Sequence, residues 1–137
     1  MKKIAYFIAI VILYGFLMGM GSTGDSAPVT VPEPETDYAV VLVDQSDVSM
    51  DLENFSCDGQ VFISGKRGSA HISIPFQKIS SVQFFLKDAV LTANVKLKDE
   101  TPVTVTVEKD QPCYGTLSYG SMKINMEDIK SITFKNE

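Results

Sequence analysis

The chain has 137 residues, 45% of them apolar, and carries 12 Lys and Arg against 17 Asp and Glu, for a formal net charge of −5. This length is enough for one ordinary domain, or for two very small ones that share a core. The acidic balance disfavours binding to nucleic acid and to anionic lipid headgroups, so we expect no nucleic-acid partner.

The first 21 residues have the layout of a secretory signal. Lys2 and Lys3 precede a continuous apolar run over residues 4–20, and small residues follow it. The run is also at the short limit for a membrane-spanning helix. We therefore expect residues 1–21 to be a cleaved signal peptide, with an uncleaved membrane anchor as the alternative. In both cases the rest of the chain is predicted to be exported, to the periplasm or out of the cell.

Residues 22–36 are predicted to be a flexible spacer. They contain three prolines among small polar residues and show no apolar periodicity. Such a composition favours an extended, solvated segment over a packed element.

Residues 37–86 alternate apolar and polar side chains with a period of two, which is typical of β-strands. Residues 38–43 suit a buried strand, and residues 48–52 a half-buried one. Asp58 and Gly59 tolerate positive φ angles and lie between strand-like flanks, so they predict a two-residue hairpin. The other predicted elements are a turn at residues 65–68, a strand that Pro75 ends, one helical turn at residues 75–79 and a last strand at residues 81–86.

Residues 87–137 repeat this pattern. Aligned without a gap, residues 65–84 and 115–134 share five identities in twenty positions. The identical pairs are Gly65 and Gly115, Ile74 and Ile124, Ile79 and Ile129, Ser81 and Ser131, and Phe84 and Phe134. Most of them fall on positions that would face inward, which indicates a duplicated folding unit. The second copy is predicted to have strands at residues 90–97, 103–107, 113–117, 122–126 and 129–134, with a tight turn at Glu127 and Asp128.

Five short strands with a helical turn before the last predict an all-β fold. Two such copies, residues 37–86 and 87–137, would make a pair of small SH3-like barrels or one joint pseudo-twofold sandwich or barrel. Each copy has only about 50 residues, so we expect the copies to bury a shared surface. Phe85 and Leu86 extend the first copy past its match to Phe134 and are candidates for that joint.

Cys57 and Cys113 are the only cysteines, and they lie in different copies. We expect them to form a disulfide that joins the copies, closing a loop of about 55 residues and stabilising the fold by about 4 kcal/mol at most. Two separate buried thiols are the alternative. Metal binding or redox activity is disfavoured because the two residues are far apart in sequence.

The polar candidates show no catalytic or metal-binding pattern. His71 is the only histidine, and Ser69 and Ser73 on the same strand would lie about 7 Å from it, too far for a direct hydrogen bond. The acids at residues 44, 47 and 51, and the pair at residues 127 and 128, lack the spacing of a calcium loop. The GKRG turn lacks the spacing of a phosphate loop. We therefore expect no enzyme, no cofactor and no metal.

The function predicted on this basis is an exported, non-enzymatic binding or envelope-interaction module, whose partner would be another envelope or extracellular protein. Its candidate interaction residues are Phe85 and Leu86, together with Tyr114 and Tyr119, which flank the turn of the second copy and could form an aromatic platform. The alternative is a periplasmic protein that binds a small ligand or a cation. Contact with a membrane is expected only through residues 4–20, if they are not cleaved.

Overall fold

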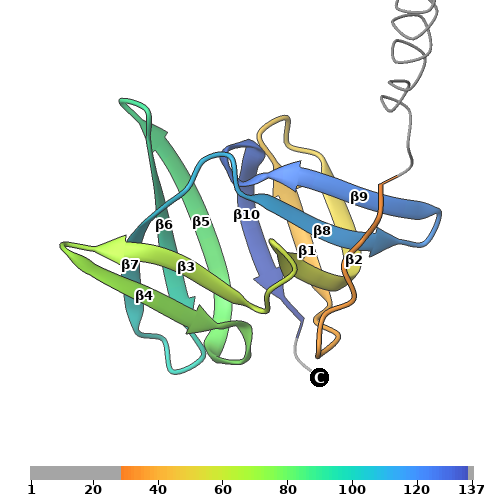
Figure 1. Ribbon diagram of the computed structural model, residues 1–137, viewed down its shortest axis with the longest axis horizontal. Coiled ribbons are helices and arrows are strands. Elements are labelled where there is room, and N and C mark those ends of the chain that lie inside the picture. The colour runs from red at the N-terminus through yellow and green to blue at the C-terminus, as the bar shows by residue number, and fades with distance from the viewer. Residues whose placement is uncertain (1–28, 136–137) are drawn as a thin grey trace, which may run out of the picture.

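The computed structural model describes residues 29–135, which form ten strands and two single-turn 3-10 helices in a curled antiparallel sheet (Figure 1). The strands are β1 (Val40–Asp44), β2 (Ser49–Cys57), β3 (Phe62–Arg67), β4 (Ala70–Pro75), β5 (Ile79–Lys87), β6 (Val90–Leu97), β7 (Pro102–Val107), β8 (Pro112–Leu117), β9 (Gly120–Asn125) and β10 (Ile129–Phe134). The helical turns are η1 (Phe76–Lys78) and η2 (Met126–Asp128). The predicted all-β fold is confirmed. The predicted signal or anchor, residues 1–21, lies outside the described residues.

The sheet has two halves, and each half combines strands from both sequence copies. The strand order is β4-β3-β7-β6-β5-β10-β1-β2-β8-β9. Strands β3 to β7 come from one continuous stretch of chain, and we call them the central half. Strands β1 and β2 join β8, β9 and β10 from the other end of the chain, and we call these five the terminal half. Of the two predicted arrangements, the structure therefore has the joint one, in a single ten-stranded sheet.

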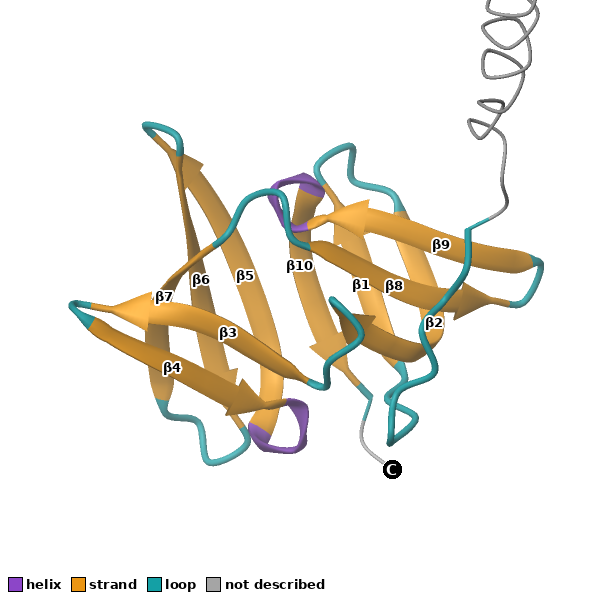
Figure 2. Cartoon of the chain, viewed as in Figure 1, coloured by secondary structure: helices purple, strands orange, loops and turns teal. Residues whose placement is uncertain are grey.

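A pseudo-twofold axis relates the halves and passes between β5 and β10. In this joint Val82 pairs with Ile132, its own repeat equivalent, and both side chains are fully buried. The flanking pairs join Gln83 to Ser131 and Ser81 to Thr133. The two helical turns accordingly lie at opposite ends of the joint in Figure 2. Packing across this axis is what allows two short copies to share one core.

The prediction that Phe85 and Leu86 form the joint is wrong. Pairing with β10 stops at Gln83, and β5 continues beyond it in a hairpin with β6, where Phe85 pairs with Thr92 and Leu86 with Leu91. This hairpin projects from the body at the upper left of Figure 1. Its end therefore leaves Phe85 and Leu86 52% and 51% exposed.

The repeated glycines mark two close approaches between strands. A Cβ atom built on Gly65 would lie 2.8 Å from the backbone oxygen of Thr106 on β7, and one built on Gly115 would lie 3.0 Å from the Leu52 side chain on β2. In each half, a strand thus passes close to its neighbour at the glycine, against rigid backbone at Gly65 and against a side chain at Gly115. This close packing explains why both copies have glycine at this position of the repeat, Gly65 and Gly115.

The turn predicted at Asp58 and Gly59 is present, but the hairpin around it is not. Both residues have positive φ, 54° and 75°, and Cys57 and Gln60 exchange backbone hydrogen bonds of 2.9 Å. Beyond this one bridge, β2 pairs with β1 and β8, while β3 pairs with β4 and β7. The turn therefore passes the chain from the terminal half to the central half.

The described part of the predicted spacer, residues 29–36, has no regular secondary structure but contacts the turn between β2 and β3. The Pro32 ring is 3.4 Å from the position a Cβ would take on Gly59. Just after this segment, a carboxylate oxygen of Asp37 accepts a 2.7 Å hydrogen bond from the backbone amide of Asn54. The chain is thus anchored to β2 before it enters β1.

Candidate functional site

The outward-facing surface of the central half is the region that the fold singles out. Because directly paired residues of an antiparallel ladder lie on the same face, the pairing defines a row that crosses five strands. That row is Phe85, Thr92, Thr106, Lys66 and His71. The neighbouring row contains Gln83, Asn94 and Thr104. We call these eight residues the outer face; all are exposed except Thr92, which is half-buried.

The strands of the central half contain no carboxylate. Their charged side chains are Lys66, Arg67, Lys87 and Lys96, all exposed. The strands of the terminal half, by contrast, contain three acids and two lysines: Asp44, Asp51, Glu53, Lys123 and Lys130. A chain whose net charge is −5 thus has one half whose sheet carries only positive charge. This separation of charge favours the approach of an anionic partner to the central half.

Phe85 stands where the other copy has an ion-paired lysine. Its repeat equivalent is Lys135, whose Nζ lies 2.9 Å from a carboxylate oxygen of Asp51. Asp51 in turn corresponds to Thr104 in the central half, where the Thr104 hydroxyl and the Asn94 side chain are joined by a 2.9 Å hydrogen bond. The same fold position therefore holds an ordinary surface ion pair in one half, and an exposed aromatic ring beside neutral polar groups in the other.

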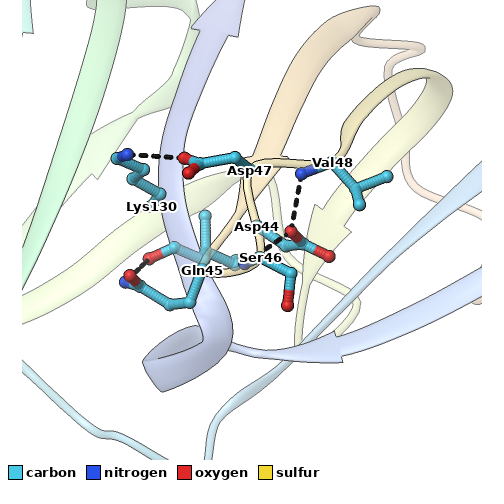
Figure 3. Close-up of polar contacts among 7 residues, drawn as sticks. Asp44, Gln45, Ser46, Asp47, Val48 and Lys130 are labelled. Atoms are coloured by element: carbon cyan, nitrogen blue, oxygen red, sulfur yellow. Dashed lines mark hydrogen bonds and ion pairs between the residues drawn. The ribbon is translucent and has the colours of Figure 1, made fainter.

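A groove of about 690 Å³ begins at Phe85 and runs towards the terminal half. It is lined by Val43, Gln45, Asp47, Gln83, Phe84, Phe85, Leu86, Glu127, Lys130 and Ser131. Its far wall is held in place by the β1–β2 loop, where Lys130 and Asp47 form a 2.6 Å ion pair and the Gln45 amide nitrogen donates a 3.0 Å hydrogen bond to the Ile129 carbonyl (Figure 3). The exposed apolar hairpin is therefore continuous with a groove that has both apolar and polar walls.

Tyr114 and Tyr119 do not lie together on one strand face. Tyr114 is half-buried on β8, opposite Ser56 and Lys123, whereas Tyr119 is 82% exposed in the turn before β9. Neither ring contacts another aromatic side chain of the described residues.

Cys57 and Cys113 form a disulfide, as the sequence predicted. The two residues face each other directly across β2 and β8, and both are fully buried. The bond therefore lies inside the terminal half. A buried disulfide suits an oxidising compartment, such as the outside of the cell. Within residues 29–135 no helix is long and apolar enough to cross a membrane.

The acidic residues near the β1–β2 loop serve the turn and nearby ion pairs. One carboxylate oxygen of Asp44 accepts 2.9 Å hydrogen bonds from the amides of Ser46 and Val48 (Figure 3). Asp47 pairs with Lys130, and Asp51 with Lys135. The described part of the chain holds no cluster of three or more His, Cys, Asp or Glu side chains that could bind a metal ion.

The remaining polar candidates lie at the outer edge of the central half. His71 is exposed on the edge strand β4, opposite Lys66. The turn predicted at residues 65–68 lies further along the chain, because residues 65–67 pair with β4 as the end of β3 and the chain turns at Gly68 and Ser69. Sequence reasoning treated His71 separately and missed the outer face to which it belongs. One feature of the sequence could have indicated this positively charged face: residues 59–87 contain no Asp or Glu.

Comparison with known proteins assigns the chain to a family. No curated protein and no solved structure matches the chain. A family model described as "Uncharacterised protein" matches residues 34–137, which include every strand of the sheet. Because this match covers more than half of the sequence, the chain belongs to that family.

Proposed function

We propose that the protein is an exported, non-enzymatic binding module that holds another macromolecule of the cell envelope or the extracellular space on its outer face. The observation that carries this proposal is the exposed ring of Phe85 in the central half, whose strands contain no carboxylate, where the other copy has Lys135 paired with Asp51. Exposure of a large apolar side chain costs solubility, and such side chains are typical of binding surfaces.

Export is the second part of the proposal. It is supported by the basic and apolar layout of residues 1–21 and by the buried disulfide. Cleavage of residues 1–21 would release the domain into the periplasm or the medium. If they were retained, they would anchor it to the membrane, with Pro32 in contact with the turn between β2 and β3.

A cross-linking experiment in the producing cell tests the binding function. A photoreactive residue in place of Gln83 would be activated in native envelopes, and the products of the wild-type background would be compared with those of Phe85→Lys and Val48→Lys. Val48 is the matched control because it is also 52% exposed but lies on the terminal half. Phe85→Lys should fold normally, since the other copy has Lys135 at this position.

The expected result is a discrete cross-linked product that Phe85→Lys loses and Val48→Lys keeps. Mass spectrometry would show whether the product contains a protein, as the sequence led us to expect. The proposal would be abandoned if folded, abundant protein gave no product above background, or if Phe85→Lys gave the wild-type product.

The groove beside Phe85 favours binding of a small ligand as the second candidate function. Its volume of about 690 Å³ is in the range of small-molecule pockets. A ligand held there would raise the melting temperature, and the increase should disappear in Lys130→Glu, which places a like charge beside Asp47. A compound library with no such hit would remove this candidate.

A further inference from the structure

The outer face presents hydrogen-bonding groups at regular intervals beside one aromatic ring. Neighbouring strands lie about 4.8 Å apart, so the row from Phe85 through Thr92 and Thr106 to Lys66 spans three strand spacings, or about 14 Å. Between its ends, the face consists of hydroxyl and amide side chains. Such a surface can bind an extended chain of polar units, with one unit stacked on the ring.

The positive charges on this surface favour a negatively charged ligand. Lys66 lies on the outer face, while Lys87 and Lys96 follow Phe85 and Asn94 at alternate positions of the same strands and therefore point to the same side. The five strands contain no carboxylate, but Lys96 forms a 3.0 Å ion pair with Glu100 of the β6–β7 loop, which leaves Lys66 and Lys87 as the cations beside the row. An anionic ligand would therefore be attracted at both ends of the row.

The chemistry of the outer face suits a hydroxyl-rich ligand better than a protein. The cores of protein interfaces are apolar, and their dominant residues are Trp, Tyr and Arg, whereas Ser and Thr are under-represented. Among the eight residues of the outer face, Phe85 is the one large apolar side chain, and Gln83 and Thr92 lie beside it. Val90, 48% exposed, lies beyond Thr92 at the end of the hairpin, opposite Lys87. A polysaccharide can instead satisfy these amides and hydroxyls with its own hydroxyl groups.

We propose that the outer face binds an acidic polysaccharide. A sugar ring stacks on Phe85, hydroxyl groups of the chain hydrogen-bond to Asn94 and Thr104, and a carboxylate of the polymer pairs with Lys66. This inference rests on the binding function proposed above and adds the chemical class of the ligand.

The test measures the affinity of the full-length protein, as recovered from the producing cell, for polymers of defined charge. Polygalacturonate, alginate and hyaluronate are the acidic polysaccharides, dextran is the neutral one and polyglutamate is the acidic polypeptide. At least one acidic polysaccharide should bind, and dextran and polyglutamate should bind at least about tenfold more weakly. Phe85→Ala should weaken the polysaccharide about tenfold, and Val48→Ala should leave it unchanged.

Three outcomes would overturn the inference. Failure of all three acidic polysaccharides to bind, or equal binding of polyglutamate or dextran, would reject the ligand class, and polyglutamate binding would point to an acidic protein instead. Unchanged affinity in Phe85→Ala would show that another surface binds the polymer. If Phe85-dependent cross-links persisted in the envelope, the binding function would survive; if they too were absent, both proposals would fail.

Discussion

At the residue scale, the two copies diverge where a side chain meets solvent and agree where it meets another strand. Val82 and Ile132 pair with each other in the joint, and Gly65 and Gly115 both admit a neighbouring strand. Phe85 and Lys135 differ because no packing constrains an outward-facing position. The difference at Phe85 is informative because the ring does not stand alone: Phe85, Leu86 and Val90 are each about half exposed on the same hairpin.

Replacing the repeated glycines should destabilise the protein to different extents. Gly65→Ala brings its new methyl group against the rigid backbone oxygen of Thr106, so we expect it to lower the free energy of unfolding by about 1–3 kcal/mol. Gly115→Ala meets the Leu52 side chain, which can shift, and should cost less. Urea denaturation would measure both, with Gly120→Ala as the control because its new methyl group meets nothing within 4 Å. Equal stability of Gly65→Ala and Gly120→Ala would contradict the close approach.

At the element scale, the disulfide lies in the half that is harder to assemble. The central half comes from one continuous stretch of chain, whereas the terminal half must bring β1 and β2 together with β8, β9 and β10 from the far end. The bond between Cys57 and Cys113 encloses the whole central half in its loop, since the two cysteines are 56 residues apart. In the disulfide-bonded chain, this loop is already closed in the unfolded state. Folding of the terminal half therefore no longer includes the entropy cost of closing it.

Removing this bond should therefore loosen one half first. In the Cys57→Ala, Cys113→Ala double variant, we expect the free energy of unfolding to fall by about 2–5 kcal/mol. Hydrogen exchange followed by mass spectrometry should show faster exchange in β1, β2 and β8 to β10 than in β3 to β7. Wild-type protein under the same conditions is the control. A uniform loss of protection over both halves would show that the disulfide does not act mainly on the terminal half.

At the scale of the whole molecule, one core spans both halves. The buried apolar side chains form a single cluster that includes Leu42 and Met126 from the terminal half together with Ile63 and Leu91 from the central half. Around η1, the rings of Tyr38, Phe55, Phe76 and Phe134 pack together, and three of these four residues belong to strands or loops of the terminal half. Neither half therefore has a complete core of its own.

We expect unfolding in a single cooperative step while the disulfide is intact. Ile132→Ala, which opens a cavity at the joint, should lower the free energy of unfolding by about 2–4 kcal/mol without splitting the transition. Coincident urea curves from far-ultraviolet circular dichroism and tyrosine fluorescence would confirm this, and Val48→Ala on the exposed loop should leave stability unchanged. Two separate transitions in either variant would mean that the halves fold independently.

The positions of the strands could be predicted because they depend on local chemistry. Alternation of apolar and polar residues located nine of them, but residues 65–67, predicted as part of a turn, belong to β3. The positive-φ residues Asp58 and Gly59 located a real turn. The helical turns η1 and η2 also lie where the repeat placed them. The candidate site was harder to predict from the sequence. Phe85 was named as a candidate for the joint between the copies, but that joint lies elsewhere on β5.

By itself, the sequence determined the strand class, the repeat and the cysteine pair, since each depends on residue type and spacing along the chain. Only the tertiary structure decided which strands are neighbours. Alternating side chains fit a half-buried strand beside any partner, so the pattern could not show that β3 pairs with β7 of the other copy instead of β2. The outer face follows from that choice, because Phe85, Thr106 and Lys66 form one row only when the copies exchange their strands.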